Sequence, residues 1–534
     1  MQEIEFNLLE EPWIRVRMPD CTVAEVSLSD ALLHAHEYTD LAGELPSQDA
    51  AVLRLLLAVL HAVFYRVDPE GNASPLENSD DALYRWEQLW SLGHLPEKPI
   101  QTYLAKWRER FWLFHPERPF YQVNQAAIGT SYGAKKLNGE ISESENKTRL
   151  FQSYAGREKE SLTYSQAARW LLYLCGYDDT SAKPKQKGLP SPGAGWLGKL
   201  GLILAAGKNL WETLLLNLVL LKDGQTLWAP PLPVWELEEP RREERVQIPQ
   251  PDNQAALLTL QSRRLLLIRE NGAVTGYTLL GGDFFEKENA FCEQMTIWRK
   301  TAEKKNTPSV YVPQRHDPAK QIWREFSAVL PDEHENMSPG IVKWLQALKP
   351  FFPKQRFVIF KTIGTEYGDK DFFINDAFSD ALVLHRELLD NIGKRCRTLV
   401  QLEVQNCEKA AQCTGALAVE IAKSAGGDGA GRAESARTQF YYLIDQPFRQ
   451  WLYKLDPDED VDEAVTLWRA QARTIAREIG RNLVEQAGPA ALVGKRENYK
   501  KGNKDCVYYH AAPKAFNRFL ADIKKIYGEQ EVKV

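Results

Sequence analysis

Residues Ser181 to Leu210 read SAKPKQKGLPSPGAGWLGKLGLILAAGKNL. The stretch contains no carboxylate, and its lysines are Lys183, Lys185, Lys187, Lys199 and Lys208. Glycines let a backbone approach another molecule closely, prolines keep the chain out of a helix, and lysines attract polyanions. The composition therefore predicts a basic, glycine-lined loop that leads into a helix and is not a packed core element. A solvated surface loop without a ligand is the simplest alternative.

Two nucleotide-binding patterns overlap in this loop. A G-x-G-x-x-G pattern is formed by Gly193, Gly195 and Gly198, and the first seven residues of a Walker A motif run from Gly193 to Lys199. Both motifs require a buried strand directly before them, whereas the preceding residues are polar and rich in proline. Leu200 also stands where the Walker motif has serine or threonine. We therefore do not expect nucleotide binding.

Length, charge and cysteine content limit the classes of protein to which the chain can belong. With 534 residues it exceeds one ordinary core, so two domains are expected. A net charge of -5 argues against a protein that coats nucleic acid unaided, although local basic surfaces can still act over the screening length of about 8 Å. The seven cysteines are scattered and form no C-x-x-C pair, so we predict neither a disulfide framework nor a metal site, and no cofactor.

The N-terminal sequence predicts neither export nor a membrane span. No basic region followed by an apolar core is present, so we expect no signal peptide and a cytoplasmic location. The most apolar run, Ala50 to Tyr65, contains Arg54 and His61 and is shorter than the roughly 20 residues that a span needs. It is predicted to be a buried helix.

The first 375 residues mix strand and helix patterns. Trp13 to Arg17 alternates as a strand does, and Ser27 to Glu37 has helix start signals. The aromatic-rich segment Ser79 to Gln122 is typical of a core, with base stacking as the alternative. Helices are also expected at Thr163 to Cys175 and Leu210 to Leu221, on either side of the glycine loop.

From Ser379 onward the periodicity predicts helices. Apolar stripes are formed by Leu384, Leu388, Ile392, Cys396 and Leu399; by Phe440, Leu443, Ile444, Phe448, Trp451, Leu452 and Leu455; by Val461, Val465, Trp468, Ala472, Ile475, Ile479 and Leu483; and by Phe516, Phe519, Leu520, Ile523 and Ile526. Short breaks, including Gly494 to Gly502, separate them. We therefore predict an α+β protein, with a mixed α/β domain over 1–375 and an antiparallel four-helix bundle over 376–534.

Three sequence stretches, in this order, carry a family resemblance. They are FNLLEEPWIRV (Phe6 to Val16), HPERPF (His115 to Phe120), and the adjoining PSPGAGWLGKLG and NLWETLLLNLVLL within Pro190 to Leu221. The whole chain resembles the family of CasA, the large subunit of the type I-E Cascade CRISPR surveillance complex.

The resemblance implies a non-enzymatic reader of nucleic acid. Its N-terminal domain would meet the 5′ handle of the guide RNA (crRNA), check the protospacer-adjacent motif (PAM) of double-stranded target DNA from the minor groove, and wedge the duplex open. The bundle would help to hold the displaced strand and to receive the helicase-nuclease. The implied partners are guide RNA, target DNA, the other Cascade subunits and this nuclease, with no membrane.

The resemblance also implies which residues take part. The PAM glycine loop falls on Lys187, Gly188, Gly193 and Gly195. The duplex wedge falls on Tyr367, Gly368 and Lys370, with Lys370 where a well-known member has glutamine. The guide-RNA handle loop falls on Phe151, Gln152 and Ser153. Basic support is expected from Arg241 and Arg242, near the motif, and from Lys495, Arg496, Lys500 and Lys501 in the bundle.

Two other classes of function compete with this one. One is a nucleotide-dependent enzyme that uses Gly193 to Lys199, or a metal nuclease that uses the pair His316 and Asp317, although this pair lacks further ligands and is more typical of a turn. The other is a scaffold that binds only proteins. Some relatives carry a cysteine cluster where this chain has only Cys292, so no zinc is predicted.

Overall fold

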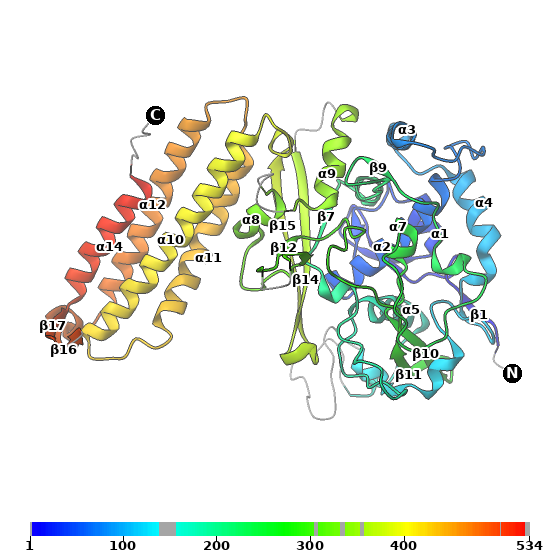
Figure 1. Ribbon diagram of the computed structural model, residues 1–534, viewed down its shortest axis with the longest axis horizontal. Coiled ribbons are helices and arrows are strands. Elements are labelled where there is room, and N and C mark those ends of the chain that lie inside the picture. Colours follow the sequence, from blue (N-terminus) through cyan, green and yellow to red (C-terminus); the bar gives the residue numbers. More distant parts are fainter. Residues whose placement is uncertain are drawn as a thin grey trace. The chain divides into compact units, whose positions relative to one another are not determined.

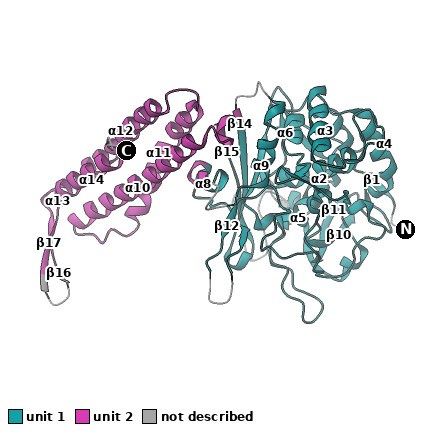
Figure 2. Cartoon of the chain, turned by 45° about the horizontal axis from the view of Figure 1, so that its top comes forward, with its two compact units in different colours: residues 1–322, 328–355, 359–381 teal, residues 323–327, 356–358, 382–534 magenta. Residues whose placement is uncertain are grey.

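The computed structural model describes residues 3–137, 156–303, 308–331, 337–352, 357–501 and 504–528. The chain forms two compact units, coloured separately in Figure 2. Unit 1 comprises residues 1–322, 328–355 and 359–381, and unit 2 comprises residues 323–327, 356–358 and 382–534. The long second unit thus begins at Leu382, slightly beyond the position where the sequence analysis places the domain boundary.

Unit 1 is built around one apolar helix, α2 (Pro46–Phe64). Pro46 occupies the first turn, where the missing N–H is not needed, and the helix therefore begins before the predicted Ala50. By length and composition α2 could cross a membrane, but 94% of its apolar window is buried inside the protein, as a core helix requires. It packs against α5 (Tyr164–Tyr177) and α7 (Gln254–Leu258) (Figure 1).

The described residues also form three three-stranded sheets. The first has the order β3 (Val23–Val26), β2 (Ile14–Arg17), β4 (Asp40–Leu41); the second β10 (Arg263–Glu270), β11 (Ala273–Gly281), β6 (Thr130–Gly133); and the third β15 (Ile374–His385), β14 (Phe357–Tyr367), β7 (Leu202–Ala206). Strand β7 lies antiparallel to β14, with Ala206 opposite Ile359. The glycine-rich stretch therefore continues into a strand, β7, before its helix begins.

The remaining elements of unit 1 are short. The helices are α1 (Leu28–Leu33), α3 (Ser79–Leu92), α4 (Glu97–Trp107), α6 (Leu210–Leu216) and α9 (Gly340–Ala347), and the strand pairs are β1 (Glu5–Asn7) with β5 (Trp112–Phe114), β8 (Leu221–Lys222) with β9 (Thr226–Leu227), and β12 (Trp298–Lys300) with β13 (Tyr311–Pro313). The short α8 (Phe326–Val329) lies between β13 and α9 in the chain. Trp86 and Phe111 are fully buried, which confirms a core role for these aromatics of Ser79 to Gln122.

Unit 2 is the predicted helical bundle. Its long helices are α10 (Lys394–Ser424), α11 (Arg432–Lys454), α12 (Val461–Glu485) and α14 (Ala512–Tyr527), which run side by side in Figure 1. Phe440, Ile444 and Phe448 of α11 are buried, as are Val465 and Trp468 of α12. The stripes predicted for these helices therefore face the bundle core, except for Leu443 of α11, which is 40% exposed.

The first predicted stripe of the C-terminal half is wrong. Ser379 to His385 belongs to β15 and not to a helix, and Ile392 of the first predicted stripe is 62% exposed. The leucines of this segment are buried because β15 pairs with β14, so strand pairing overrides the helical spacing. The predicted break that begins at Gly494 is confirmed. It follows the short α13 (Pro489–Val493) and contains a hairpin of β16 (Lys495–Lys501) and β17 (Lys504–His510).

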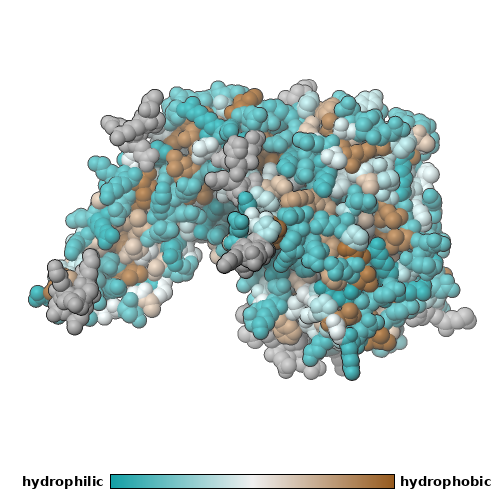
Figure 3. Space-filling view, in the orientation of Figure 1, coloured by the Kyte–Doolittle hydropathy of each residue, from teal (hydrophilic) through white to brown (hydrophobic). Residues whose placement is uncertain are grey.

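The face of the molecule shown in Figure 3 is mainly hydrophilic. On the face shown in Figure 3, apolar residues occur as scattered patches among hydrophilic side chains. The large buried side chains lie instead within the two units, among them Trp86, Trp323 and Trp468.

Candidate nucleic-acid interface

The exposed half of the glycine-rich stretch contains two glycines that the backbone requires. Lys187 and Gly188 are exposed, and Gly188 and Gly193 have φ angles of +88° and +67°. A Cβ atom at either glycine would meet no heavy atom within 4 Å. Glycine is needed there for its left-handed conformation, and the space beside it is open.

The second half of the stretch is packed, contrary to the prediction. A Cβ atom on Gly195 would lie 2.2 Å from the carbonyl oxygen of Gly176, and one on Gly198 would lie 2.0 Å from the hydroxyl oxygen of Tyr367. Both glycines are buried. Gly195 therefore lets the backbone pack on α5, so of the predicted glycine-loop residues it is the one that faces the interior.

Buried charges hold the exposed loop in place. The Glu244 carboxylate accepts hydrogen bonds from the backbone N–H groups of Lys185 (3.0 Å) and Gln186 (3.1 Å). The Arg263 guanidinium donates to the carbonyl oxygen of Gly193 (2.6 Å) and pairs with the Asp178 carboxylate (2.7 Å). Burial raises the pKa of Asp178, although Arg263 and a lysine act in the opposite direction. Glu244 and Arg263 lie far from the loop in sequence, and the adjacent arginines 263 and 264 in a leucine-rich run were the only sign of the second anchor.

The predicted wedge lies at the turn between β14 and β15. Tyr367 ends β14 and donates its hydroxyl proton to the carbonyl oxygen of Tyr177 (2.6 Å), while Lys370 is exposed. Gly368 has an ordinary φ angle of -69°. Lys370, Asp371 and Phe373, in contrast, all have φ angles between +56° and +65°. Non-glycine residues in this region each cost roughly 1–3 kcal/mol and persist where the surroundings fix them.

One arginine joins the wedge turn to the glycine-rich stretch. Arg315 pairs with the Asp371 carboxylate (2.6 Å), donates from Nε to the carbonyl oxygen of Gly198 (2.6 Å), and lies 4.7 Å from the centre of the Tyr367 ring. The backbone N–H of Thr180 also donates to the carbonyl oxygen of Asp371 (3.1 Å). The structure thus joins the predicted wedge turn to Thr180 and Gly198, which flank the predicted loop residues in unit 1.

The wedge turn also presents an aromatic side chain that is not among the predicted site residues. Phe372 is 45% exposed, next to the exposed Lys370. The sequence GDKDFF contained the signal, since an aromatic pair in a polar turn is unusual. An exposed ring at a turn can stack on a base pair.

The predicted basic residues are distributed unevenly. Arg241 pairs with Asp283 (2.9 Å) and Arg242 with Glu239 (2.9 Å), so their charges are balanced locally. In unit 2, Lys495 and Arg496 are exposed on β16. Lys500 and Lys501 belong to the same strand, but their side chains, like Phe151, Gln152 and Ser153, lie outside what the structure describes.

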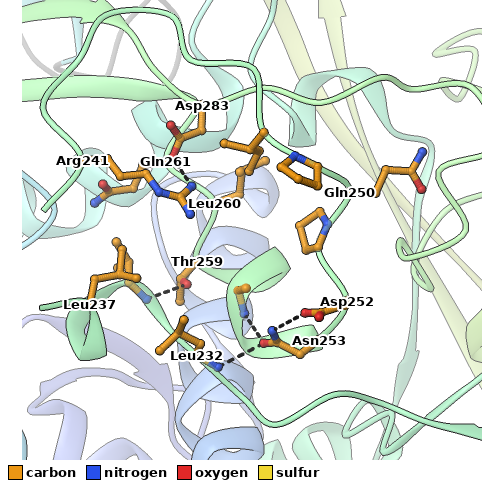
Figure 4. Close-up of a pocket in the computed structure, with 15 residues that line it drawn as sticks. Leu232, Leu237, Arg241, Gln250, Asp252, Asn253, Thr259, Leu260, Gln261 and Asp283 are labelled. Carbon is orange, nitrogen blue, oxygen red and sulfur yellow. Dashed lines mark hydrogen bonds and ion pairs between the residues drawn. The ribbon is translucent and has the colours of Figure 1, made fainter. Parts of the chain in front are cut away.

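A cavity of about 290 Å³ lies beside Arg241 (Figure 4). Its polar groups are engaged within the protein: the Asn253 side-chain oxygen accepts from the N–H of Ala256 (2.9 Å), and the Thr259 hydroxyl accepts from the N–H of Val234 (3.1 Å). Most other lining residues are apolar or proline, including Leu232, Leu237, Pro249 and Pro251. Apart from Arg241, it contains no predicted site residue.

The residues proposed for an enzyme have structural roles. His316 is buried, with Nε2 3.0 Å from the carbonyl oxygen of Leu202, and the Asp317 carboxylate accepts from the N–H of Ala319 (3.0 Å). Gly193 to Lys199 follows a coil and not a strand. Within the described parts of the chain, no group of three or more His, Cys, Asp or Glu residues could hold a metal ion.

The sequence matches a known family over most of its length. The model of the family described as CRISPR-associated protein Cse1 covers residues 7–479. The chain belongs to the Cse1 family. This membership confirms the resemblance to CasA, because a curated Thermus thermophilus relative is named CRISPR-associated protein CasA/Cse1 and is 32% identical over 332 residues. That match spans 61% of this chain and 60% of the Thermus protein.

Solved Cse1 structures share the fold. Thermobifida fusca Cse1 is 30% identical, with a TM-score of 0.83 and coverage of 98% of both chains. A chain of a solved CRISPR RNA-guided surveillance complex covers 97% of this chain and 99% of its own length, with a TM-score of 0.72 and 19% identity. At that identity the likeness concerns the fold. Both units of the Cse1 chain therefore have counterparts in solved structures.

Proposed function

We propose that this Cse1 chain is the large subunit of a type I-E Cascade complex that acts in antiviral defence. In this role it contacts the crRNA 5′ handle, recognises the PAM in double-stranded DNA, helps to open the duplex and stabilise the R-loop, and recruits the helicase-nuclease. It works in the cytoplasm with the other Cascade subunits, without a membrane and without catalysing a reaction itself. Family membership and the surveillance complex that contains a chain of the same fold support this proposal.

The contact that Arg315 makes between the glycine-rich stretch and the wedge turn carries the proposal. The minor groove is only about 6 Å wide, so a backbone free of side chains approaches its floor best. Gly188 and Gly193 offer such a backbone with open space beside it. Phe372 and Lys370 at the linked turn could then meet the base pairs next to the motif.

Weak intrinsic affinity fits a subunit that is delivered to DNA by its complex. The chain has a net charge of -5, and Arg241 and Arg242 are paired with carboxylates. Attachment to an RNA-loaded complex raises the effective concentration of the loop at the duplex, so local contacts become sufficient. We therefore expect sequence preference from the complex and little from the isolated chain.

Reconstitution tests the proposal. Complexes assembled with and without this chain are titrated with duplexes whose motif bases are varied, and affinity is measured by gel shift or anisotropy. We expect motif-dependent binding only when the chain is present. Equal motif preference without the chain would contradict the proposal, and so would tight, sequence-specific binding of duplex by the isolated chain.

A further inference from the structure

The hairpin of β16 and β17 turns one of its faces towards the helices of unit 2. In its register Lys495 lies opposite His510, and Glu497 lies opposite Tyr508. Successive side chains of a strand point to opposite faces, so these four side chains share one face of the hairpin. His510 is buried, whereas Tyr509, on the other face, is 47% exposed. The face with His510 is therefore the one that meets the bundle, at whose end the hairpin lies in Figure 2.

His510, the last residue of β17, lies between two carboxylates. Its Nδ1 atom is 2.9 Å from a carboxylate oxygen of Glu420 in α10, and its Nε2 atom is 2.6 Å from one of Glu497 in β16. An ionised carboxylate accepts hydrogen bonds and donates none, so each ring nitrogen must carry a hydrogen to make both contacts. The geometry therefore requires the positively charged imidazolium form of His510.

The charged groups around this contact come from four elements. The hydrogen bond from His510 lowers the pKa of the Glu497 carboxyl, and the charges of His510, Lys423 and Lys495 act in the same direction. The Tyr508 ring lies 4.6 Å from the His510 ring, and the Lys514 ammonium lies 4.4 Å from the Tyr508 ring. The titratable groups near His510 are thus Glu420 and Lys423 of α10, Lys495 and Glu497 of β16, Tyr508 of β17 and Lys514 of α14.

The hairpin depends on such contacts with the helices. A two-stranded hairpin alone is marginally stable at best in water. The Tyr509 hydroxyl donates to the carbonyl oxygen of Val493 in α13, and the Lys514 ammonium of α14 donates to the carbonyl oxygen of Tyr509 (3.4 Å). His510 supplies the hydrogen bond to α10. A neutral ring has one N–H and one lone pair, so one of the two carboxylates would then face the lone pair and lose its hydrogen bond.

We infer that His510 is a pH-sensitive switch, which holds the β16–β17 hairpin on α10 while its ring is protonated and loosens the hairpin when the ring loses the proton. The inference concerns unit 2 alone and does not rest on the proposed function. The exposed cations Lys495 and Arg496 belong to the same hairpin, so their placement on unit 2 changes with the charge of one ring.

The direction of the pH effect follows from the two kinds of group. Because the pKa of Glu497 is lowered, its contribution to stability is present above the ordinary carboxyl value of 4.5 and is lost as pH falls through the lower folded value. The contribution of the imidazolium is present at low pH and is lost as pH rises and the ring deprotonates. Histidine usually changes its charge between pH 5 and 8, so we expect the contact to be intact at pH 6 and weakened at pH 9.

Nitrogen NMR of the full chain, labelled in its histidine rings, tests the charge of His510. The His510 signals are those that disappear in the His510→Gln variant. We expect both ring nitrogens to carry a hydrogen at pH 6 and only one of them at pH 9. A ring with a single N–H at pH 6, or one that still carries both hydrogens at pH 9, would overturn the inference.

Hydrogen exchange of the β17 backbone amides tests whether this charge holds the hairpin. At pH 6, His510→Gln should exchange about 10-fold faster than the parent, because charge-assisted hydrogen bonds are lost. At pH 9 the two should differ by about 2-fold or less, since the parent has then lost the imidazolium as well. Comparing variant and parent at the same pH removes the chemical effect of pH on exchange. An equal ratio at both pH values would make His510 a fixed structural contact and not a switch.

A milder variant and a control complete the test. Glu497 is half-exposed, so Glu497→Gln should fold; it keeps the shape of the side chain but removes one of the two charges that favour the imidazolium. Its β17 amides should exchange about 3-fold faster at pH 6, and its ring should deprotonate at a lower pH than in the parent. Glu485→Gln is the control, because Glu485 is exposed on α12 and is not a partner of His510; it should change exchange by about 2-fold or less. If His510→Gln fails to fold, the pH of deprotonation in Glu497→Gln decides, and an unchanged value contradicts the inference.

Discussion

The two halves of the stretch 181–206 contain similar residues and behave in opposite ways. In the first half, Gly188 and Gly193 have positive φ angles and open space beside them. In the second half, Gly195 and Gly198 are buried where backbone and a tyrosine ring approach closely, and β7 follows. Glycine is therefore required for the left-handed backbone conformation in the first half and for close packing in the second half. Only the first half is available to meet a ligand, and the second positions it.

The largest effect is expected at the anchor between the two halves. Arg263→Met should destabilise the protein by about 3–5 kcal/mol, because it leaves the buried Asp178 carboxylate without its closest partner and frees the Gly193 carbonyl. Chemical denaturation of the full chain measures this. Arg241→Met is the control, since its partner Asp283 keeps the buried Arg264 at 2.5 Å. A loss below about 1 kcal/mol for Arg263→Met would show that the loop is held by other contacts.

A substitution in the packed half should come next. Gly195→Ala places a Cβ atom 2.2 Å from the Gly176 carbonyl oxygen, and backbone on both sides must shift to accommodate it. We expect a loss of about 3 kcal/mol in the free energy of unfolding. In the exposed half, Gly193→Ala adds only the strain of a positive φ angle, about 1–2 kcal/mol. Equal destabilisation by the two variants would erase the distinction between the halves.

The sequence predicts those elements whose contacting residues lie close together in the chain, and it fails for elements that are fixed by distant residues. The stripes of α11 and α12 were predicted correctly because the helical period lies within each segment. For β15, the leucine spacing suited a helix, and only pairing with β14 shows a strand. Long-range pairing of this kind leaves no local signal.

The candidate site was predicted only in outline, because its details also depend on residues that are distant in sequence. The composition of 181–210 indicated a basic loop, but nothing local distinguishes Gly193 from Gly195, whose neighbour Gly176 lies in α5. Nor does the run Arg241, Arg242 and Arg245 reveal which cation is unpaired. The acids Glu239 and Asp283 decide that, and Asp283 approaches only in the folded chain.

A substitution at the wedge turn should have a small effect on the free energy of unfolding and a larger effect on duplex opening. Phe372 is 45% exposed, so Phe372→Ala should change the free energy of unfolding by less than about 1 kcal/mol. If its ring stacks on a base pair, its loss should weaken duplex opening by about 1–3 kcal/mol. Fluorescence of 2-aminopurine next to the motif measures opening in the reconstituted complex. Phe372→Tyr retains an aromatic ring and should restore it, whereas normal opening by the alanine variant would exclude a stacking role.

The smallest effect concerns pH. The pKa of Lys199 in the folded protein is about 8, below that of an unfolded lysine at about 10.4, so the unfolded chain binds more protons between these values. Stability should therefore gain a contribution as pH rises from about 8 towards 10. Lys199→Met should lack this gain, measured as the difference between variant and parent in urea unfolding at pH 7.5 and 9.5. Identical pH profiles would show that burial and the cations Arg245, Arg263, Lys287 and Arg315 do not lower the pKa of Lys199.

The bridge made by Arg315 has a consequence for fidelity. A single side chain holds a carbonyl of the glycine-rich stretch and a carboxylate of the wedge turn, so neither segment can shift without disturbing the other. In the proposed function, a duplex with the wrong motif would fail to seat against the loop. The wedge turn, which Arg315 links to the glycine-rich stretch, would then be displaced as well. Choosing a target and prising it apart would then be one thermodynamic step, with a shared coupling free energy. Under the proposed function, a duplex that fails to seat against the loop would therefore also fail to be opened.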